Sequence, residues 1–177
     1  MQASSSNRFP EIDLNTATSA QRLFVDEITS GPRKAIIGPF IPLLHAPELA
    51  RRVQKVGEYL RFESTLPADV RECAILVVAH RWKSLFEWRI HAEIAQSVGL
   101  PPAVAVAIES DFAIETLETP YREIVAFCRR CLDTGDVGEM NFEDAKTRYG
   151  HVGVIELLTI CGYYSTLAMY LSSAGIE

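Results

Sequence analysis

Around Leu76, the segment PADVRECAILVVAHRW (residues 67–82) is apolar on almost every side when it is placed on a helix. Such a helix has no face suited to water, so other elements must surround it, and we expect it to be the central helix of the fold. The rest of the sequence contains no clean two-residue alternation bounded by turns and no Asn-Gly or Asp-Gly hairpin motif. Together these features predict an all-α helical bundle with seven or eight helices.

Length and composition limit how many domains the chain can form. With 177 residues, of which 48% are hydrophobic, the chain can bury one sizeable core, whereas two independent cores would each be thin. Residues 1–16 are polar at first and then contain Pro10, which favours a flexible N-terminal arm. The sequence therefore predicts a single all-α domain over residues 17–177.

Charge and hydropathy argue against several classes of partner. The formal net charge is -6, and because nucleic-acid binding depends on excess Lys and Arg, we expect no nucleic-acid partner. The apolar stretch near the C-terminus is interrupted by Glu156 and Gly162, and the first residues lack the apolar core of a secretory signal. We therefore predict a cytoplasmic protein with no membrane partner, whose four cysteines form no disulfide scaffold.

Two helix starts are marked by residues that cap or open a helix. Ser64 or Thr65 is the expected N-cap of the central helix, with Pro67 in its first turn. Further along the chain, Asn141 is the expected cap of a short helix that is followed by a long apolar one.

The segment SLFEWRIH (84–91) places four polar or aromatic side chains on one helix face. Ser84, Glu87, Trp88 and His91 stand at i, i+3, i+4 and i+7, a spacing that stacks side chains along a helix. The simplest interpretation is an ordinary i, i+4 pair of Glu87 and His91 at a surface or subunit contact. Glu72 favours a site instead, because a carboxylate on the nearly all-apolar helix needs a partner, and His91 could supply it.

These residues lie in a segment that resembles a known family. LPADVRECAILVVAHRWKSLFEWRIHAEIAQSVGL (66–100) is similar to the core of the carboxymuconolactone decarboxylase family, which includes the alkylhydroperoxidase D-like proteins, and the similarity extends over most of residues 31–175. The usual form has an Arg-Glu pair opening an apolar helix, then a Glu-Trp and a His, then a small-residue helix that ends in Gly. The matching positions are Arg71, Glu72, Glu87, Trp88, His91 and Gly99.

The resemblance implies an all-helical fold that forms a homotrimer or a homohexamer, with sites near subunit contacts. In the peroxidase branch of the family, a Cys-x-x-Cys follows the glutamate by twelve residues, and a histidine comes four residues after the second cysteine. Counted from Glu72, those positions hold Ser84, Glu87 and His91, so both cysteines are missing. Because peroxide reduction in that branch needs a thiolate and a resolving thiol, we expect this site to have a different chemistry.

The remaining residues suit proton transfer without a cofactor. A histidine titrates near neutral pH, and partial burial can raise the pKa of a carboxylate toward neutral pH. Such a cluster can therefore hold one acid and one base. We predict that His91 transfers the proton, that Glu72 orients it, that Glu87 is a second acid or base, and that Ser84 donates a hydrogen bond to substrate. The expected reaction, by analogy with the family's name, is decarboxylation or isomerisation of a small organic acid or lactone.

Further side chains are candidates for substrate contacts. The candidates are His80, Trp82, Trp88, Tyr163, Tyr164 and Arg71. Each has a structural alternative, since aromatic side chains at helical spacing are commonly plain core and His80 could cap carbonyls. Arg71 could hold a substrate carboxylate, or it could form a surface ion pair with Glu58 or Glu63.

Two other functions stay open at this point. Cys128 and Cys131 form a Cys-x-x-Cys of their own, which would allow a peroxiredoxin-like alkyl hydroperoxide reductase, although they lie in the second half of their helix, where its dipole disfavours thiolates. A non-catalytic ligand-binding oligomer is the third class. No metal site is expected, because structural zinc needs four ligands and no second close cysteine pair occurs.

Overall fold

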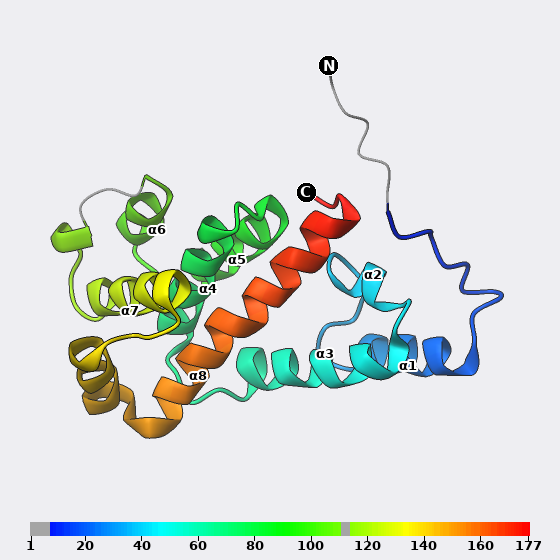
Figure 1. The fold of residues 1–177 in the computed structure, drawn as a ribbon, viewed down its shortest axis with the longest axis horizontal. Helices are drawn as coiled ribbons and strands as arrows, with labels where there is room; N and C mark the ends of the chain where they lie inside the picture. Colours follow the sequence, from blue (N-terminus) through cyan, green and yellow to red (C-terminus); the bar gives the residue numbers. More distant parts are fainter. Residues whose placement is uncertain (1–7, 111–113) are drawn as a thin grey trace, which may run out of the picture. The chain divides into compact units, whose positions relative to one another are not determined.

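The computed structural model describes residues 8–110 and 114–177, and within these ranges the protein is helical with no strand (Figure 1). Helices make up about 72% of the protein, which confirms the prediction of an all-α fold with seven or eight helices. The elements are α1 (Ser19–Ser30), α2 (Phe40–Leu43), α3 (Pro47–Phe62), α4 (Ala68–Arg81), α5 (Leu85–Ser97), α6 (Pro102–Glu109), the 3-10 helix η1 (Ile114–Thr116), α7 (Tyr121–Thr134) and α8 (Glu139–Ala174).

The chain packs as two compact units. The first unit comprises residues 1–63 together with 167–177, and the second unit comprises residues 64–166. Helix α8 therefore contributes its last residues to the first unit and the rest to the second. The sequence led us to expect one undivided domain over residues 17–177, and that expectation stays a prediction.

The first unit has its own small core. Its fully or nearly buried side chains are Phe24, Ile28, Phe40, Leu43, Leu44 and Ala50. Thr18 opens α1 with a capping box. Its hydroxyl oxygen accepts a hydrogen bond from the backbone N–H of Gln21, and the side-chain oxygen of Gln21 accepts one from the backbone N–H of Thr18. Residues 8–16 of the predicted arm contact this unit, since the carbonyl of Pro10 lies 2.9 Å from Nε2 of His45. Residues 1–7 of that arm lie outside the described residues.

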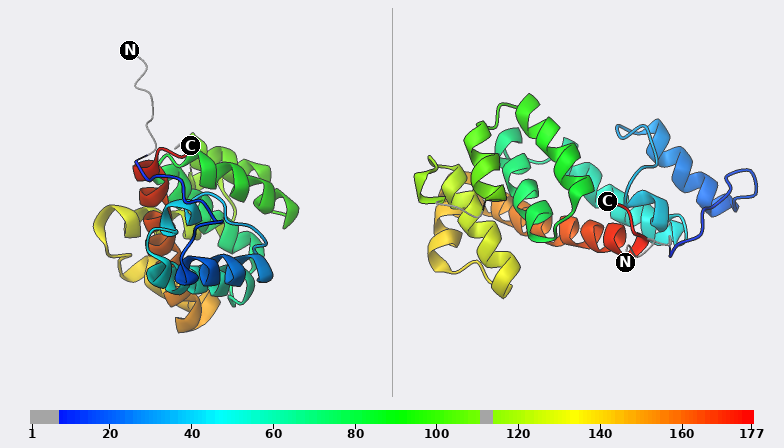
Figure 2. Two further views of the ribbon diagram at one scale, coloured as in Figure 1. Left: turned by 90° about the vertical axis from the view of Figure 1, so that its right-hand side faces the viewer. Right: turned by 90° about the horizontal axis from the view of Figure 1, so that it is seen from above.

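The second unit is organised around α4, as the apolar segment predicted. Every side chain from Glu72 to Ala79 is buried, and α4 packs against α5, α6 and α7. The right-hand view of Figure 2 shows α4 beside α5 and α6. A helix covered on all sides leaves no room for an unpaired charge, so each polar side chain on α4 needs a partner.

The start of α4 differs from the prediction. The helix begins at Ala68 after Pro67, and no side chain caps it. The hydroxyls of Ser64 and Thr65 instead donate to a carboxylate oxygen of Glu156 on α8, at 3.0 and 2.9 Å. The prediction that Ser64 or Thr65 caps α4 was therefore wrong, because the helix begins only at Ala68, with Pro67 at the N-cap position, so that both hydroxyl residues precede its first turn. Glu156 is only 3% exposed, and the backbone N–H of Thr65 donates to it as well.

Helix α8 consists of two helical pieces. Gly150 interrupts it with φ 67° and ψ -179°, a conformation that favours glycine, so the predicted order of a short helix and then a long apolar one is correct. The predicted cap is wrong, since the helix begins at Glu139 and the amide of Asn141, inside it, donates to the carbonyl of Val137.

Among the described residues, α8 alone is long and apolar enough to cross a membrane, and 61% of its most apolar window is buried, as in a core helix.

The Glu156 anchor yields a prediction about stability. We expect Glu156→Ala to lower the free energy of unfolding by about 1–3 kcal/mol, because it removes the hydrogen bonds that its buried carboxylate accepts from the partly buried Ser64 and the exposed Thr65. Urea unfolding followed by circular dichroism measures this change. The matched control Glu93→Ala removes an exposed carboxylate and should shift the free energy by no more than about 0.5 kcal/mol. Equal urea midpoints for Glu156→Ala and wild type would contradict the prediction.

Candidate functional site

His91 of α5 lies between two carboxylates. Its Nδ1 is 2.6 Å from Oε2 of Glu72 on α4, and its Nε2 is 3.4 Å from Oε2 of Glu87, one turn earlier on α5. Because a carboxylate oxygen only accepts hydrogen bonds, Nδ1 carries the proton in the short contact. We call Glu72, Glu87 and His91 the buried triad. The structure thus brings together the three residues predicted to carry proton transfer.

The buried triad is shielded from solvent. Glu72 is 1% exposed, His91 3% and Glu87 5%. Charged groups at such depth are stable only when they are paired, and each member of the triad has a partner within it. Arg71 adds a fourth charge, since its Nε lies 3.6 Å from Oε1 of Glu72. Its guanidinium therefore faces the triad and offsets one of the two carboxylates.

The surroundings of His91 change its acidity. Burial by itself lowers the pKa of His91, but hydrogen bonds and charges from Glu72 and Glu87 outweigh burial and raise that pKa above its ordinary value. The imidazolium form is therefore favoured up to higher pH than for an isolated histidine, and both ring nitrogens then donate. A group of this kind is a general acid with two carboxylate acceptors beside it.

Two tyrosines of α8 cover the triad from one side. The ring of Tyr164 meets that of His91 edge-on with centroids 5.1 Å apart, and Tyr163 stands 5.3 Å from Tyr164. Tyr163, predicted to touch substrate, is 8% exposed and borders the other tyrosine rather than the imidazole. Tyr164 is the aromatic neighbour of His91. The sequence could not show whether Tyr163 or Tyr164 would contact the imidazole, because the two tyrosines are adjacent on α8.

A cavity of about 270 Å³ opens at the start of α5, and we call it the α5 cavity. It is lined by Ala79, His80, Lys83, Ser84, Leu85, Trp88 and Glu109. Ser84 precedes α5 without capping it, and its Oγ is buried with no hydrogen-bond partner among the described residues. The rings of His80 and Trp88 meet edge-on with their centroids 6.1 Å apart. Three predicted contact residues, His80, Ser84 and Trp88, therefore share one cavity.

The predicted site divides into two sets of residues. The lining of the α5 cavity does not include the buried triad, whereas Ser84 and Trp88 do line it. Helix α5 joins the two sets, because Ser84 and Trp88 alternate with Glu87 and His91 within two turns. The other predicted pocket wall, Trp82, donates its ring N–H to Ser165 at 2.7 Å.

Sequence reasoning missed Lys83 and Glu109 as lining residues. Lys83 occupies the turn between α4 and α5 with φ 53°, a left-handed conformation that is rare for a residue with a side chain. Nothing in its sequence context marks that conformation, because glycine is the usual residue there. Glu109 ends α6, and its approach to α5 depends on tertiary packing alone.

The cysteine pair of α7 has a third thiol beside it. Cys128 is fully buried, Cys131 is partly exposed, and both interact with Cys161 of α8. The hydrogen bond with Cys161, together with burial, raises the pKa of the Cys131 thiol well above its ordinary value. Since thiol peroxidases need a thiolate, this environment disfavours the predicted redox alternative.

No group of three or more His, Cys, Asp or Glu residues within the described ranges is arranged to hold a metal ion. The members of the buried triad contact each other at 2.6 and 3.4 Å.

No known family, curated protein or solved structure matches this chain. The similarity to the carboxymuconolactone decarboxylase family thus depends on the residues quoted above and stays a prediction.

The raised pKa of His91 yields a prediction about stability. A raised pKa in the folded state means that protonation of His91 stabilises the fold fully below the unfolded pKa, about 6.5, and that this contribution is lost as pH rises through the folded pKa. We expect the stability advantage of wild type over His91→Gln to shrink steadily between pH 6 and pH 9. Denaturant unfolding at each pH measures the difference. A constant difference over this range would be incompatible with the raised pKa.

The thiol cluster yields a prediction about reactivity. In native protein at pH 8, we expect Cys128 and Cys131 to react with Ellman's reagent at least about tenfold more slowly than in urea, because Cys128 is buried away from the reagent, while the hydrogen bond with Cys161 and burial disfavour the thiolate of Cys131. Absorbance at the reagent's product band gives the rates, and Cys131→Ser shows which thiol accounts for any fast phase. A fast native reaction lost in Cys131→Ser would instead favour the peroxidase function.

Proposed function

We propose that this protein is a cofactor-independent enzyme of the carboxymuconolactone decarboxylase type that moves protons on a small organic acid or lactone, as a decarboxylase or isomerase. The observation that carries the proposal is the buried triad, in which a histidine with a raised pKa is held between two carboxylates. The nearby α5 cavity supports it, because it offers space of substrate size beside the same helix.

The two carboxylates have different roles in this proposal. Glu72 is the orienting residue, since its 2.6 Å contact to Nδ1 fixes the ring and stabilises the imidazolium. Glu87 is the proton-transfer partner. Its 3.4 Å contact to Nε2 of His91 is longer than a usual hydrogen bond, so the imidazole holds this carboxylate less firmly than it holds Glu72. A carboxylate held loosely one turn from Ser84 can take a proton from His91 and pass it toward the cavity.

The proposed reaction balances without a cofactor. In a β-keto acid or a carboxylated lactone, the bond to the carboxyl carbon breaks, carbon dioxide leaves, and the electron pair of that bond moves into the conjugated carbonyl. The resulting enolate takes a proton that His91 supplies through Glu87, and solvent restores the proton on His91. Isomerisation uses the same groups, with the proton removed at one carbon and returned at another.

The α5 cavity would bind the substrate in this proposal. Ser84 is suited to hydrogen-bond the substrate carbonyl, because its Oγ is buried and has no partner among the described side chains and backbone groups. Trp88 and Leu85 give an apolar wall that lowers the local polarity and strengthens such a bond. Arg71 balances charge at Glu72, and its predicted contact with a substrate carboxylate is part of the proposal.

We further propose a homo-oligomer, a trimer or a hexamer. The second unit exposes large apolar side chains on several helices, including Leu85 at 59%, Val106 at 62% and Ile155 at 61%. The proposal follows the family resemblance, and these exposed side chains are available for contacts between copies. The cytoplasmic location and the absence of nucleic-acid and membrane partners remain expectations from composition.

A second candidate function is ligand binding without catalysis in an oligomer that keeps the fold. The observation that favours it is the burial of the triad, since Glu72, Glu87 and His91 are at most 5% exposed and do not line the α5 cavity. In that case the triad stabilises α4 against α5, and the cavity alone recognises the small molecule.

Turnover by designed variants distinguishes the two functions. On a panel of β-keto acids and carboxylated lactones, we expect carbon dioxide release and deuterium uptake from D₂O by wild type. We expect Glu87→Gln, which is close in shape but cannot carry a proton, to reduce turnover about 10²–10⁴-fold. His91→Ala should abolish turnover, and Glu93→Gln, an exposed change on the same helix, should leave it intact.

The outcomes are separable by a binding measurement on the same panel. Saturable binding of a panel member by wild type, with no turnover and no effect of Glu87→Gln on affinity, would favour the non-catalytic function. Turnover that persists in both Glu87→Gln and His91→Ala would overturn the proton-transfer proposal.

A further inference from the structure

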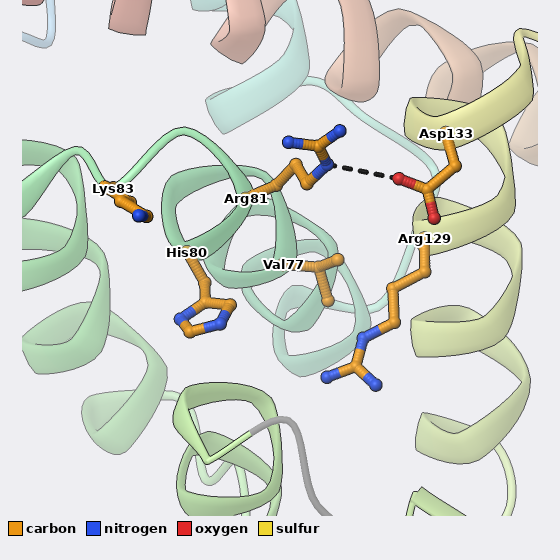
Figure 3. A pocket seen from close by; sticks show the side chains of 6 residues that line it. All are labelled: Val77, His80, Arg81, Lys83, Arg129 and Asp133. Atoms are coloured by element: carbon orange, nitrogen blue, oxygen red, sulfur yellow. Dashed lines mark hydrogen bonds and ion pairs between the residues drawn. The ribbon is translucent and has the colours of Figure 1, made fainter.

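A second cavity, of about 280 Å³, lies between the end of α4 and helix α7, and we call it the α4–α7 cavity (Figure 3). Its lining residues are Val77, His80, Arg81, Lys83, Arg129 and Asp133. All of them belong to the second unit. His80 and Lys83 also line the α5 cavity, whereas Arg129 and Asp133 do not.

The α4–α7 cavity is cationic in a protein that is acidic. Three of its side chains, Arg81, Lys83 and Arg129, are cations, and Asp133 is the one carboxylate among its lining residues. With His80 neutral the lining carries two net positive charges, although the whole chain carries a formal net charge of -6. A concave surface concentrates such a field and attracts anions from solution.

Asp133, the one carboxylate in the lining, is paired with Arg81, the more exposed of the two arginines in the lining. Nε of Arg81 donates to Oδ1 of Asp133 at 3.1 Å, and both side chains are more than half exposed, at 55% and 58%. Figure 3 shows this pair at the upper edge of the cavity, while Arg129 extends from α7 across the space toward His80. Among the lining residues, the charge of Asp133 is therefore directed at Arg81.

Lys83 is held in a conformation that its side chain does not favour. The backbone N–H of Ser84 donates to the carbonyl of Ala79 at 2.9 Å, and that of Lys83 donates to His80 at 3.0 Å. These two bonds form a Schellman motif, whose left-handed position is normally occupied by glycine and here is Lys83 with φ 53°. A left-handed residue with a side chain is under strain, so a lysine there suggests that its ammonium has a use.

The dipole of α4 explains why some, but not all, of the cations lie in this lining. Arg81 and His80 lie in the last turn of α4, where positive charge favours the helix dipole. Arg129, however, comes from the interior of α7. The Schellman bonds also satisfy carbonyls at the end of α4, which reduces the negative potential that an anion would meet there.

We propose that the α4–α7 cavity binds the dianionic oxyanion group of a small molecule, a phosphate monoester or a dicarboxylate, with Arg129 and Lys83 as its direct contacts. A guanidinium matches two oxygens of such a group, and an ammonium adds a point charge. The two net charges of the lining equal those of a dianion. The proposal does not rest on the proton-transfer function proposed above, since none of the buried triad lines this cavity, although the α5 cavity shares His80 and Lys83 with it.

The test uses the full chain and three probes at constant ionic strength near 0.15 M, with chloride as the background anion. Isothermal calorimetry with inorganic phosphate, phenyl phosphate and succinate should give saturable binding with a dissociation constant of about 1 mM or tighter for at least one probe. Preference for the two phosphates identifies a phosphate-bearing ligand, and preference for succinate identifies a dicarboxylate. Absence of saturable binding by all three overturns the proposal.

Three variants locate the site. Arg129→Gln should weaken binding at least about tenfold, because it removes a charge-assisted hydrogen bond. Asp133→Asn should strengthen binding, since it removes the only carboxylate of the lining and frees Arg81. The control Arg122→Gln makes the same charge change at an exposed position near the start of α7 and should leave affinity unchanged within about twofold.

Lys83→Gly separates binding from folding. Glycine suits the left-handed position, so the variant should keep or raise the thermal unfolding midpoint while its affinity for the probe falls several-fold. Loss of affinity in a variant that is no less stable cannot come from unfolding. Unchanged affinity in both Lys83→Gly and Arg129→Gln would overturn the assignment of this cavity.

Discussion

The contact between Glu72 and His91 allows the central helix to be both fully buried and charged. Helix α4 is covered by α5, α6 and α7, so a carboxylate on it would be unstable without a cationic partner inside the protein. His91 supplies that partner at 2.6 Å and in doing so fixes how α5 is rotated about its axis. The position of Glu87 and of the cavity residues Ser84 and Trp88 follows from this rotation, because all of them lie on α5 or at its start.

Much of this arrangement could be predicted from sequence, because it depends on local pattern. The apolar segment around Leu76 predicted a central helix, and helical spacing placed Glu87 and His91 on one face. The pairing of Glu72 with His91 followed from the physical rule that a carboxylate on an apolar helix needs a partner. The break in α8 at Gly150 was also foreseeable, since glycine is the residue that tolerates it.

The remaining features depend on contacts between segments that are distant in sequence. Ser64 and Thr65 looked like helix caps, but Glu156, about ninety residues away, takes their hydrogen bonds. Nothing in the local sequence of Cys161 links it to the cysteine pair of α7, and only the fold places it beside that pair. The left-handed conformation of Lys83 had no sequence marker at all. Local pattern therefore predicted which residues matter near α5 but not which cavities they line.

The division of α8 between the two units has a consequence for the order in which the protein is made. The chain leaves the first unit after residue 63 and returns to it at residue 167, where Tyr170 packs on the core of that unit. During synthesis from the N-terminus, every residue of the second unit is therefore made before the first unit has all of its parts. While the second unit is being made, the core of α1–α3 lacks its contact with Tyr170, so that the first unit is completed only after the whole second unit has been synthesised.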